Sequence, residues 1–467
     1  SRWNVPSNSL QKFNISTGDD ADTQKINGSL SENNRTHSYL ARVNYDFDEK
    51  YVISGTFRRD GSSRFKDGFR YGNFYSVGLG WVASREAFLE NSIFGLLKFR
   101  GSYGKLGNQG VPLNILTATT GSAGFYPFGP SQTVQQGITI DGTVVEDLTW
   151  ETTQELNLGV EFTLFNNQLS AEFDIYQRLT PNLISLVRLP DVFGFKPYWS
   201  HVGELENKGV EALVSWNNGE SRKLHYSVTL TASHNSNELT KITNRYFDEQ
   251  TGGSLNNGQY TKRVREGYPL GSFFLYEVEG IDDRGKLVYK DHNNNGTIDE
   301  GDRRFFGSYL PDITAGLNLG LDYKKFDFEI DLYTNIGSKV YNGKKAQRFS
   351  NENIENQVFN HRWTTSSPSN TGSHAFNEVP VASNYYLESG DFLRINNLTV
   401  GYTLPKNAAK SFFDKIRFYV TAKNLLTLKK FSGFTPELVG EPLGGAAVEL
   451  DAYPTLRSIY LGINTTF

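Results

Sequence analysis

The chain of 467 residues contains no cysteine, which excludes disulfides, thiolate nucleophiles and cysteine-ligated zinc within it. Methionine is absent as well, which is unusual beside 33 Phe. Long apolar runs are missing too. No stretch approaches the roughly 18 consecutive apolar residues that a transmembrane helix needs, and the mean hydropathy is -0.47. The net charge is -4 without a basic stripe, which argues against a nucleic-acid partner.

The sequence also contains none of the common enzyme signatures that were sought. The seven histidines form no HExxH pair. No GxSxG motif, Walker A loop or GxGxxG turn after a strand occurs either. The sequence therefore predicts a protein that is not an enzyme.

The carboxyl-terminal segment alternates apolar and polar side chains up to its last residue. One face carries Ile459, Leu461, Ile463, Thr465 and Phe467, and the other carries Tyr460, Gly462, Asn464 and Thr466. Because strand side chains point alternately to opposite faces, this pattern places one face in an apolar medium and the other in a polar one. An aromatic terminal strand of this kind is typical of bacterial outer-membrane barrels. The alternative is an edge strand of a soluble sandwich.

Thirteen segments are predicted to be strands, and several have about the 9–11 residues that cross a bilayer when tilted. They are 36–47, 51–59, 74–84, 97–107, 153–164, 169–179, 204–216, 223–235, 312–323, 326–336, 392–404, 415–425 and 456–467.

The connections between these segments alternate between short turns and longer loops. The short turns are 48–50, 85–96, 165–168, 217–222, 324–325 and 405–414, and the longer loops are 60–73, 108–152, 180–203, 236–311, 337–391 and 426–455. This sorting indicates a transmembrane antiparallel β-barrel with short periplasmic turns and long extracellular loops. Aromatic residues such as Tyr45, Phe47 and Tyr51 flank the short turns, which is typical of an interfacial girdle. Cross-strand pairs in a soluble core are the alternative.

The number of predicted strands is odd, whereas bacterial single-chain barrels have even numbers. The all-β fold is therefore predicted to be the carboxyl-terminal portion of a larger outer-membrane barrel, at residues 36–467, with an extracellular loop at 1–35. Five carboxylates fall on the face that would line the lumen: Glu155, Glu161, Glu172, Asp174 and Glu211. A polar barrel interior explains them more simply than acid–base catalysis does.

Several segments resemble the SusC/RagA family of TonB-dependent outer-membrane transporters of Bacteroidetes. The similar segments include RVNYDFDEKYVISGTFRRDGSSRF (42–65), SVGLGW (76–81), LKFRGSYGKLGNQG (97–110), LTWETTQELNLGVEF (148–162), FDIYQRLTPNLI (173–184), NKGVEALVSW (207–216), DFLRINNLTVGYTLP (391–405), IRFYVTAKNLLTLKKFSGFTPEL (416–438) and the final YPTLRSIYLGINTTF. They occur in the family's order and extend over nearly the whole chain from about residue 36.

The resemblance implies a barrel of about 22 strands with an amino-terminal plug. It also implies a SusD-like surface lipoprotein as a lid and energy from TonB through the plug. The plug and the TonB-contacting segment are expected to lie outside these residues. The function implied is uptake of oligosaccharides or peptides, without covalent chemistry.

The sharpest local motif, at residues 291–302, fits a Ca²⁺ loop with Asp in place of the final bidentate Glu. The predicted ligands are Asp291, Asn293, Asn295, Thr297 through its backbone carbonyl, Asp299 and Asp302. Gly296 permits the sharp turn. Two Asn lower the ligand charge, so we expect modest affinity and a structural role in the 236–311 loop. A metal-free Asn/Gly turn is the alternative.

Aromatic residues in the longer loops are the other candidate sites, because aromatic faces can stack on sugar rings or peptide side chains. They are Phe125, Tyr126, Phe128, Tyr198, Trp199 and Trp363. Packing against a lid or a neighbouring loop is the alternative for each.

Three functions remain open from sequence. The first is the barrel portion of a SusC-type importer. The second is a passive porin, which an even strand count would favour. The third is a soluble glycan-binding β-sandwich, which would stay in aqueous solution without detergent.

Overall fold

The structure is a computed structural model, and it describes most of the chain. The described residues are 34–112, 120–130, 132–140, 145, 147–193, 196–219, 223–347, 356–368, 381–405, 413–450 and 452–466. The predicted loop at 1–35 lies almost wholly outside them, as does Phe467.

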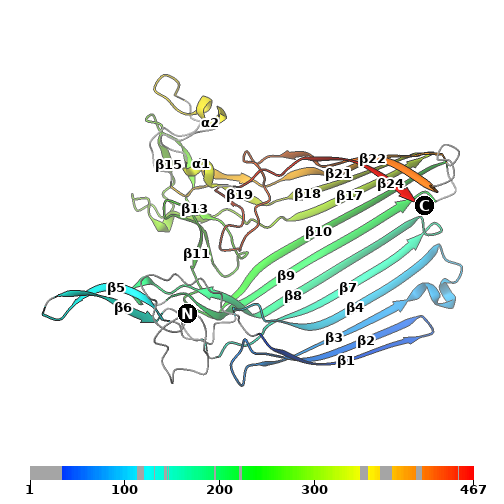
Figure 1. Cartoon of the computed structure of the whole chain (residues 1–467), viewed down its shortest axis with the longest axis horizontal. Helices are drawn as coiled ribbons and strands as arrows, with labels where there is room; N and C mark the ends of the chain where they lie inside the picture. Colours follow the sequence, from blue (N-terminus) through cyan, green and yellow to red (C-terminus); the bar gives the residue numbers. More distant parts are fainter. Residues whose placement is uncertain are drawn as a thin grey trace.

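One antiparallel sheet of thirteen strands dominates the described residues (Figure 1). Its strands, in sheet order, are β1 (Thr36–Phe47), β2 (Tyr51–Ser62), β3 (Tyr71–Val82), β4 (Phe94–Asn108), β7 (Glu151–Leu164), β8 (Leu169–Val187), β9 (Tyr198–Asn217), β10 (Leu224–Ile242), β17 (Ile313–Tyr323), β18 (Phe326–Ile336), β21 (Phe392–Thr403), β22 (Lys415–Lys429) and β24 (Ser458–Thr466). All thirteen correspond to the predicted strands. A single sheet of this size excludes the two packed sheets of a sandwich.

The sheet has two edges among the described residues. Strand β1 pairs with β2 and strand β24 pairs with β22, while every other strand of the sheet has two neighbours. The sheet is thus an open wall rather than a closed cylinder. We refer to it below as the wall.

Large apolar side chains line one face of the wall and remain exposed there. On β3 they are Tyr71, Tyr75, Val77, Leu79 and Trp81, and on β24 they are Ile459, Leu461 and Ile463. Leu461 is 82 % exposed, which is expected of a surface that faces lipid instead of water. The intervening residues of β3 are smaller, with Ser76, Gly78 and Gly80 on the opposite, lumen-facing side.

Aromatic pairs mark the end of the wall that carries the short turns. Their rings lie between 4.9 and 6.4 Å apart, in the pairs Phe47–Tyr51, Trp81–Phe99, Phe165–Trp216 and Phe326–Tyr402. The girdle predicted at the short-turn end is therefore present.

Three central strands continue further toward the long-loop end than the sequence predicts. Strands β8, β9 and β10 have 19, 20 and 19 residues. The first of them is predicted to end at residue 179, and Pro181 and Asn182, both turn-forming residues, follow directly. The register of β8 with β9 shifts between Thr180 and Leu183, so a local irregularity accommodates the proline and pairing resumes as far as Val187.

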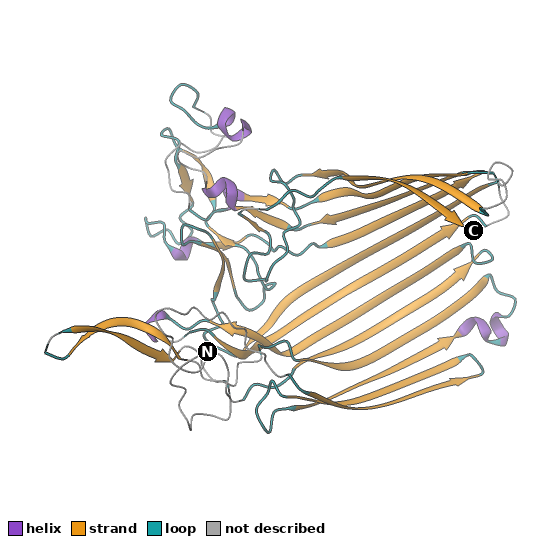
Figure 2. Ribbon diagram, viewed as in Figure 1, coloured by secondary structure: helices purple, strands orange, loops and turns teal. Residues whose placement is uncertain are grey.

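The long loops contain strands and short helices of their own, which the sequence did not predict. These elements are β5 (Thr120–Phe128), β6 (Thr133–Ile140), β11 (Thr251–Ser254), β12 (Tyr260–Arg263), β13 (Phe274–Leu275), β14 (Val278–Ile281), β15 (Leu287–Tyr289), β16 (Arg304–Phe305), β19 (Lys339–Asn342), α1 (Gly343–Gln347), α2 (Asn356–His361), β20 (Leu387–Ser389) and β23 (Val448–Glu449). Figure 2 shows them gathered beyond the end of the wall opposite the short turns. Within the described ranges, no helix combines the length and apolar character required to cross a membrane.

Candidate functional site in the extracellular loops

Three long loops pack into one body at the end of the wall. The three-stranded sheet β20–β19–β23 takes β19 and β20 from the 337–391 loop and β23 from the 426–455 loop. Its apolar core consists of Leu255, Phe273, Leu275, Ile281, Leu287, Val340, Tyr341, Ala346, Ala382, Tyr386, Phe431, Ala447 and Val448. We call residues 251–306, 339–347, 381–389 and 431–450 the loop body. Its core is buried like that of a small globular domain.

Lys262 fastens strand β12 to the last of these loops. Its ammonium group donates to the backbone carbonyl of Pro442 at 2.9 Å, and also to those of Gly444 and Ala446. The aromatic rings of Phe273 and Tyr309 lie 5.6 and 5.2 Å from the nitrogen. The residue is fully buried, and this burial lowers the pKa of Lys262 to about 7. The carbonyls and aromatic faces favour the charged ammonium, whereas burial favours the neutral amine. Because the resulting pKa is near 7, the charge on Lys262 in this contact changes with pH.

The predicted calcium loop at 291–302 is compact and internally hydrogen-bonded. Asp291 accepts from the backbone N–H groups of Asn295 and Gly296, at 3.3 and 2.8 Å. The side chains of Asn293 and Asn295 both donate to the carboxylate of Asp299. Gly296 has a φ of 82°, which glycine adopts without strain. Thr297 also donates to Asn295 Oδ1. Five of the six predicted ligands thus lie in one network, and Asp302 joins it from below.

Asp302 has a different position, at the base of this loop. It is fully buried, and its carboxylate accepts backbone hydrogen bonds from His292, Asn293 and Asp299. These contacts lower the pKa of Asp302, the bond from Asp299 most of all. Among the described residues, no group of three or more His, Cys, Asp or Glu could hold a metal ion. A cation in this loop would therefore need the amide and carbonyl oxygens of the predicted set in addition to its carboxylates.

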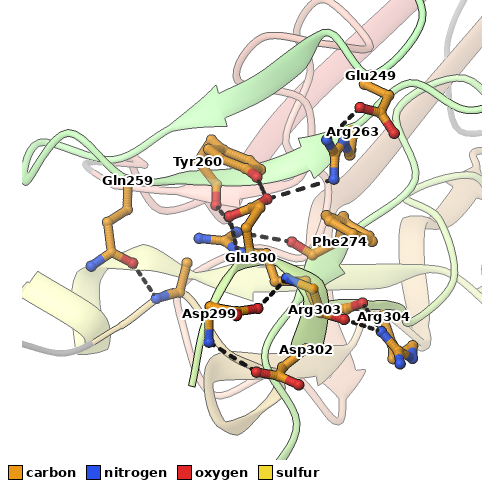
Figure 3. Close-up of polar contacts among 12 residues, drawn as sticks. Glu249, Gln259, Tyr260, Arg263, Phe274, Asp299, Glu300, Asp302, Arg303 and Arg304 are labelled. Carbon is orange, nitrogen blue, oxygen red and sulfur yellow. Dashed lines mark hydrogen bonds and ion pairs between the residues drawn. The ribbon is translucent and has the colours of Figure 1, made fainter. Parts of the chain in front are cut away.

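Glu300 of this motif and Arg303, directly after it, attach the motif to neighbouring strands of the loop body (Figure 3). Arg303 is 5 % exposed and donates to the carbonyls of Tyr260 and Phe274, at 3.0 and 3.2 Å. Its guanidinium lies 4.2 Å from the Tyr260 ring centre and 4.5 Å from that of Tyr276. Glu300 pairs with Arg303 at 3.2 Å and accepts from the Tyr260 hydroxyl. The shape of the 291–302 loop is thus coupled to β12 and β13.

The predicted aromatic candidates do not form one site. Tyr198 and Trp199, at the start of β9, are half-buried and pack on a cluster that includes Phe65 and Trp150. Trp363 packs instead against the loop-body core. Phe125 lies on β5 and is 74 % exposed.

Tyr126 and Phe128 belong to the same strand as Phe125, but their side chains lie outside the part of the chain that the structure describes. Lys262, Glu300 and Arg303 were not among the residues predicted from the sequence. Glu300 and Arg303 could have been predicted as functional residues, because they lie within or next to the 291–302 motif. Lys262 lies in no motif and could not have been predicted.

Comparisons with known proteins agree with this architecture. The model of the family described as TonB dependent receptor-like, beta-barrel, matches residues 1–425. The chain belongs to this family of TonB-dependent receptors. Its barrel is therefore an outer-membrane protein, and the predicted resemblance to SusC/RagA is confirmed.

Two curated TonB-dependent receptors illustrate the relationship. Receptor P3 of Formosa agariphila is 30 % identical over 462 residues, which cover 92 % of this chain and 45 % of that protein. Receptor SusC of Bacteroides thetaiotaomicron is 28 % identical over 450 residues, covering 92 % and 43 %. This receptor chain thus spans about half the length of these relatives.

A solved structure of the RagAB peptide transporter superimposes on this receptor chain with a TM-score of 0.82 and 26 % identity. The match covers 97 % of this chain and 50 % of the solved one. The RagAB peptide importer in its closed-closed state gives a TM-score of 0.81 at 25 % identity.

The lumen face of the receptor carries paired charges. Arg100 contacts Glu161, Glu172 and Asp174, and Lys98 also pairs with Glu161. Near β10 and β17, Glu172, Asp174 and Glu211 border a hollow of about 390 Å³. These carboxylates, which the sequence placed in the lumen, mostly have cationic partners, as expected for a polar interior.

Proposed function

We propose that this chain is the barrel portion of a SusC-type importer, which takes up oligosaccharides or peptides with energy from TonB. The observation that carries the proposal is the combination of a lipid-facing wall with a folded loop body at one end, in an arrangement that superimposes on RagAB with a TM-score of 0.82. A membrane barrel that only let solutes diffuse would have no need of TonB.

A SusD-like lipoprotein is the proposed lid over the loop body. Phe125 on the β5–β6 hairpin is an exposed candidate for contact with substrate or lid, because the hairpin projects beyond the end of the wall (Figure 1). For Tyr198, Trp199 and Trp363, their half-buried packing favours a supporting role in shaping the loops. TonB would act through a plug that these residues do not supply.

The proposal is tested with the complete receptor in cells. Uptake of fluorescent peptides and of fluorescent oligosaccharides is measured with the receptor present, deleted, or present in a strain without TonB. Accumulation of one class should require both receptor and TonB, and affinity purification should recover a SusD-like lipoprotein. Uptake that persists without TonB would instead identify a passive porin.

Calcium in the 291–302 loop is the second part of the proposal. The supporting observations are the side-chain oxygens of Asp291, Asn293 and Asn295, which accept from backbone N–H groups inside the loop, and the turn at Gly296. Bound Ca²⁺ would stiffen the loop and, through Glu300 and Arg303, the loop body. It would have no catalytic role.

The calcium proposal is tested by proteolysis of the loop body with and without Ca²⁺. Asp291→Ala should abolish protection by Ca²⁺, whereas Asp283→Ala, at an exposed residue of the neighbouring hairpin, should leave it intact. Equal protection of both variants would exclude this loop as the calcium site.

A further inference from the structure

The connection between β3 and β4 leaves two large apolar side chains exposed at the short-turn end of the wall. It includes two single-turn 3₁₀ helices, Ala83–Arg85 and Ala87–Leu89. Phe88 is 72 % exposed and Ile93 is 70 % exposed. Short turns of barrels are normally polar and very short, so this turn has an unusual composition.

Glu86 attaches the beginning of this turn to the outer face of the wall. The hydroxyl of Tyr51 donates to Glu86 Oε1 at 2.6 Å, and Trp81 Nε1 donates to the same oxygen at 3.3 Å. Tyr51 and Trp81 lie directly opposite each other on β2 and β3. Both belong to the exposed apolar rows of the lipid face. The turn therefore leaves the wall on its lipid-facing side.

Charged residues of the adjacent β1–β2 turn surround the other side of this connection. Arg85 pairs with Glu49. Lys50 lies 3.0 Å from Asp48 and 3.9 Å from Glu86. Aromatic anchors, charged groups and exposed apolar side chains thus meet within one small region. This combination is characteristic of the boundary between lipid headgroups and acyl chains.

We propose that residues 83–93 form an interfacial anchor that inserts Phe88 and Ile93 into the phospholipid of the periplasmic leaflet. The occupant is lipid because Tyr51 and Trp81, which hold Glu86 of the same turn, belong to the exposed apolar band of the wall. The ion pairs with Glu49 and Asp48 keep the charged part of the region at the headgroup level. The anchor would fix the depth of this part of the barrel in the membrane.

Site-directed spin labelling tests this inference, helped by the absence of cysteine from the chain. A nitroxide is attached at Phe88→Cys in the complete receptor, freed of other cysteines and reconstituted in phospholipid vesicles. Collision rates with oxygen, which concentrates in lipid, and with a water-soluble nickel chelate are compared. Leu79→Cys on the lipid face and Val439→Cys, which is 99 % exposed in an extracellular loop, are the reference positions.

The label at position 88 should resemble that at 79, with oxygen collisions several-fold favoured over those at 439. A preference for the nickel chelate would place Phe88 in water and overturn the proposal. Shielding from both probes would mean that protein covers the site, which would also overturn it.

A second variant tests the junction itself. Glu86→Ala should reduce the oxygen preference at position 88, whereas Glu90→Ala on the same turn should leave it unchanged. The label at position 79 should be unaffected in both variants, which shows that the barrel remains inserted. An unchanged oxygen preference in Glu86→Ala would refute the role of Glu86 as the attachment point.

Discussion

The wall and the loop body place their large apolar side chains in opposite environments. Leu461 on β24 is 82 % exposed, and Leu79 on β3 is 58 % exposed, whereas Phe273 and Tyr341 in the loop body are fully buried. The difference arises because the wall is surrounded by lipid and the loop body by water. Lipid accepts apolar side chains from outside, so the wall needs no apolar core, while the loop body must exclude water from its own core.

The largest effect is expected from opening the loop-body core. Phe273→Ala should destabilise the loop body by about 3–5 kcal/mol, because it removes a fully buried aromatic ring and leaves a cavity. Hydrogen exchange of the loop-body amides should accelerate strongly, while the wall amides keep their protection. Tyr453→Ala, at a residue that is 79 % exposed, is the control. Uniform acceleration across wall and loops would show that the two regions are not independent.

The second-largest destabilisation is expected from a charged side chain on the lipid face. Leu79→Arg should destabilise the wall by up to about 2–4 kcal/mol, depending on the depth of the residue in the bilayer. The lumen-facing Thr56→Arg should cost much less, because that face is polar. The midpoint of urea unfolding in vesicles measures both. If the two variants had the same midpoint, the assignment of the two faces would be wrong.

A smaller effect is expected at the attachment of the 291–302 loop. Glu300→Gln removes the carboxylate that lies 3.2 Å from Arg303 and 3.6 Å from Arg263, and should cost about 1–2 kcal/mol because Glu300 is half exposed. Proteolysis between residues 291 and 302 should become faster. Glu279→Gln, at an exposed carboxylate of β14, provides the matched control, and equal rates in the two variants would contradict the coupling.

The smallest change is a pH dependence of the loop body. An unfolded Lys has a pKa of about 10.4, whereas burial lowers the pKa of Lys262 to about 7. Above pH 7 the folded state therefore binds fewer protons than the unfolded state, and stability should rise by about 1 kcal/mol from pH 6 to pH 8. Burial raises the pKa of the neighbouring Tyr309, so that group stays neutral in this range. Hydrogen exchange at residues 260–263 measures the effect, which Lys262→Met should remove. A slope that survives this substitution would assign the titration to another group.

The sequence predicted the wall far better than the loop body. Thirteen strands follow from period-two alternation, and the bounds of 36–47 and 326–336 agree with β1 and β18. The largest differences are at the long-loop ends of β8, β9 and β10. In β8, Pro181 interrupts the local pattern, although pairing with β9 resumes beyond it. Local alternation detects a strand, but it does not reveal a register that recovers after an irregularity.

The candidate site was predictable only where it was local in sequence. The motif at 291–302 could be recognised because its residues are close along the chain. The contact of Lys262 with carbonyls 180–184 positions away has no local pattern. The same holds for the loop-body core, whose residues come from three loops.

The sequence by itself therefore determined the strands, their two faces and the sorting of turns and loops, because each is a repeat over neighbouring residues and the membrane is a uniform solvent. Only the tertiary structure decided how the loops fold on one another, which carbonyls receive Lys262 and where Arg303 is buried. Those contacts join distant segments, and their energies depend on a water-excluding core that no single segment can form alone.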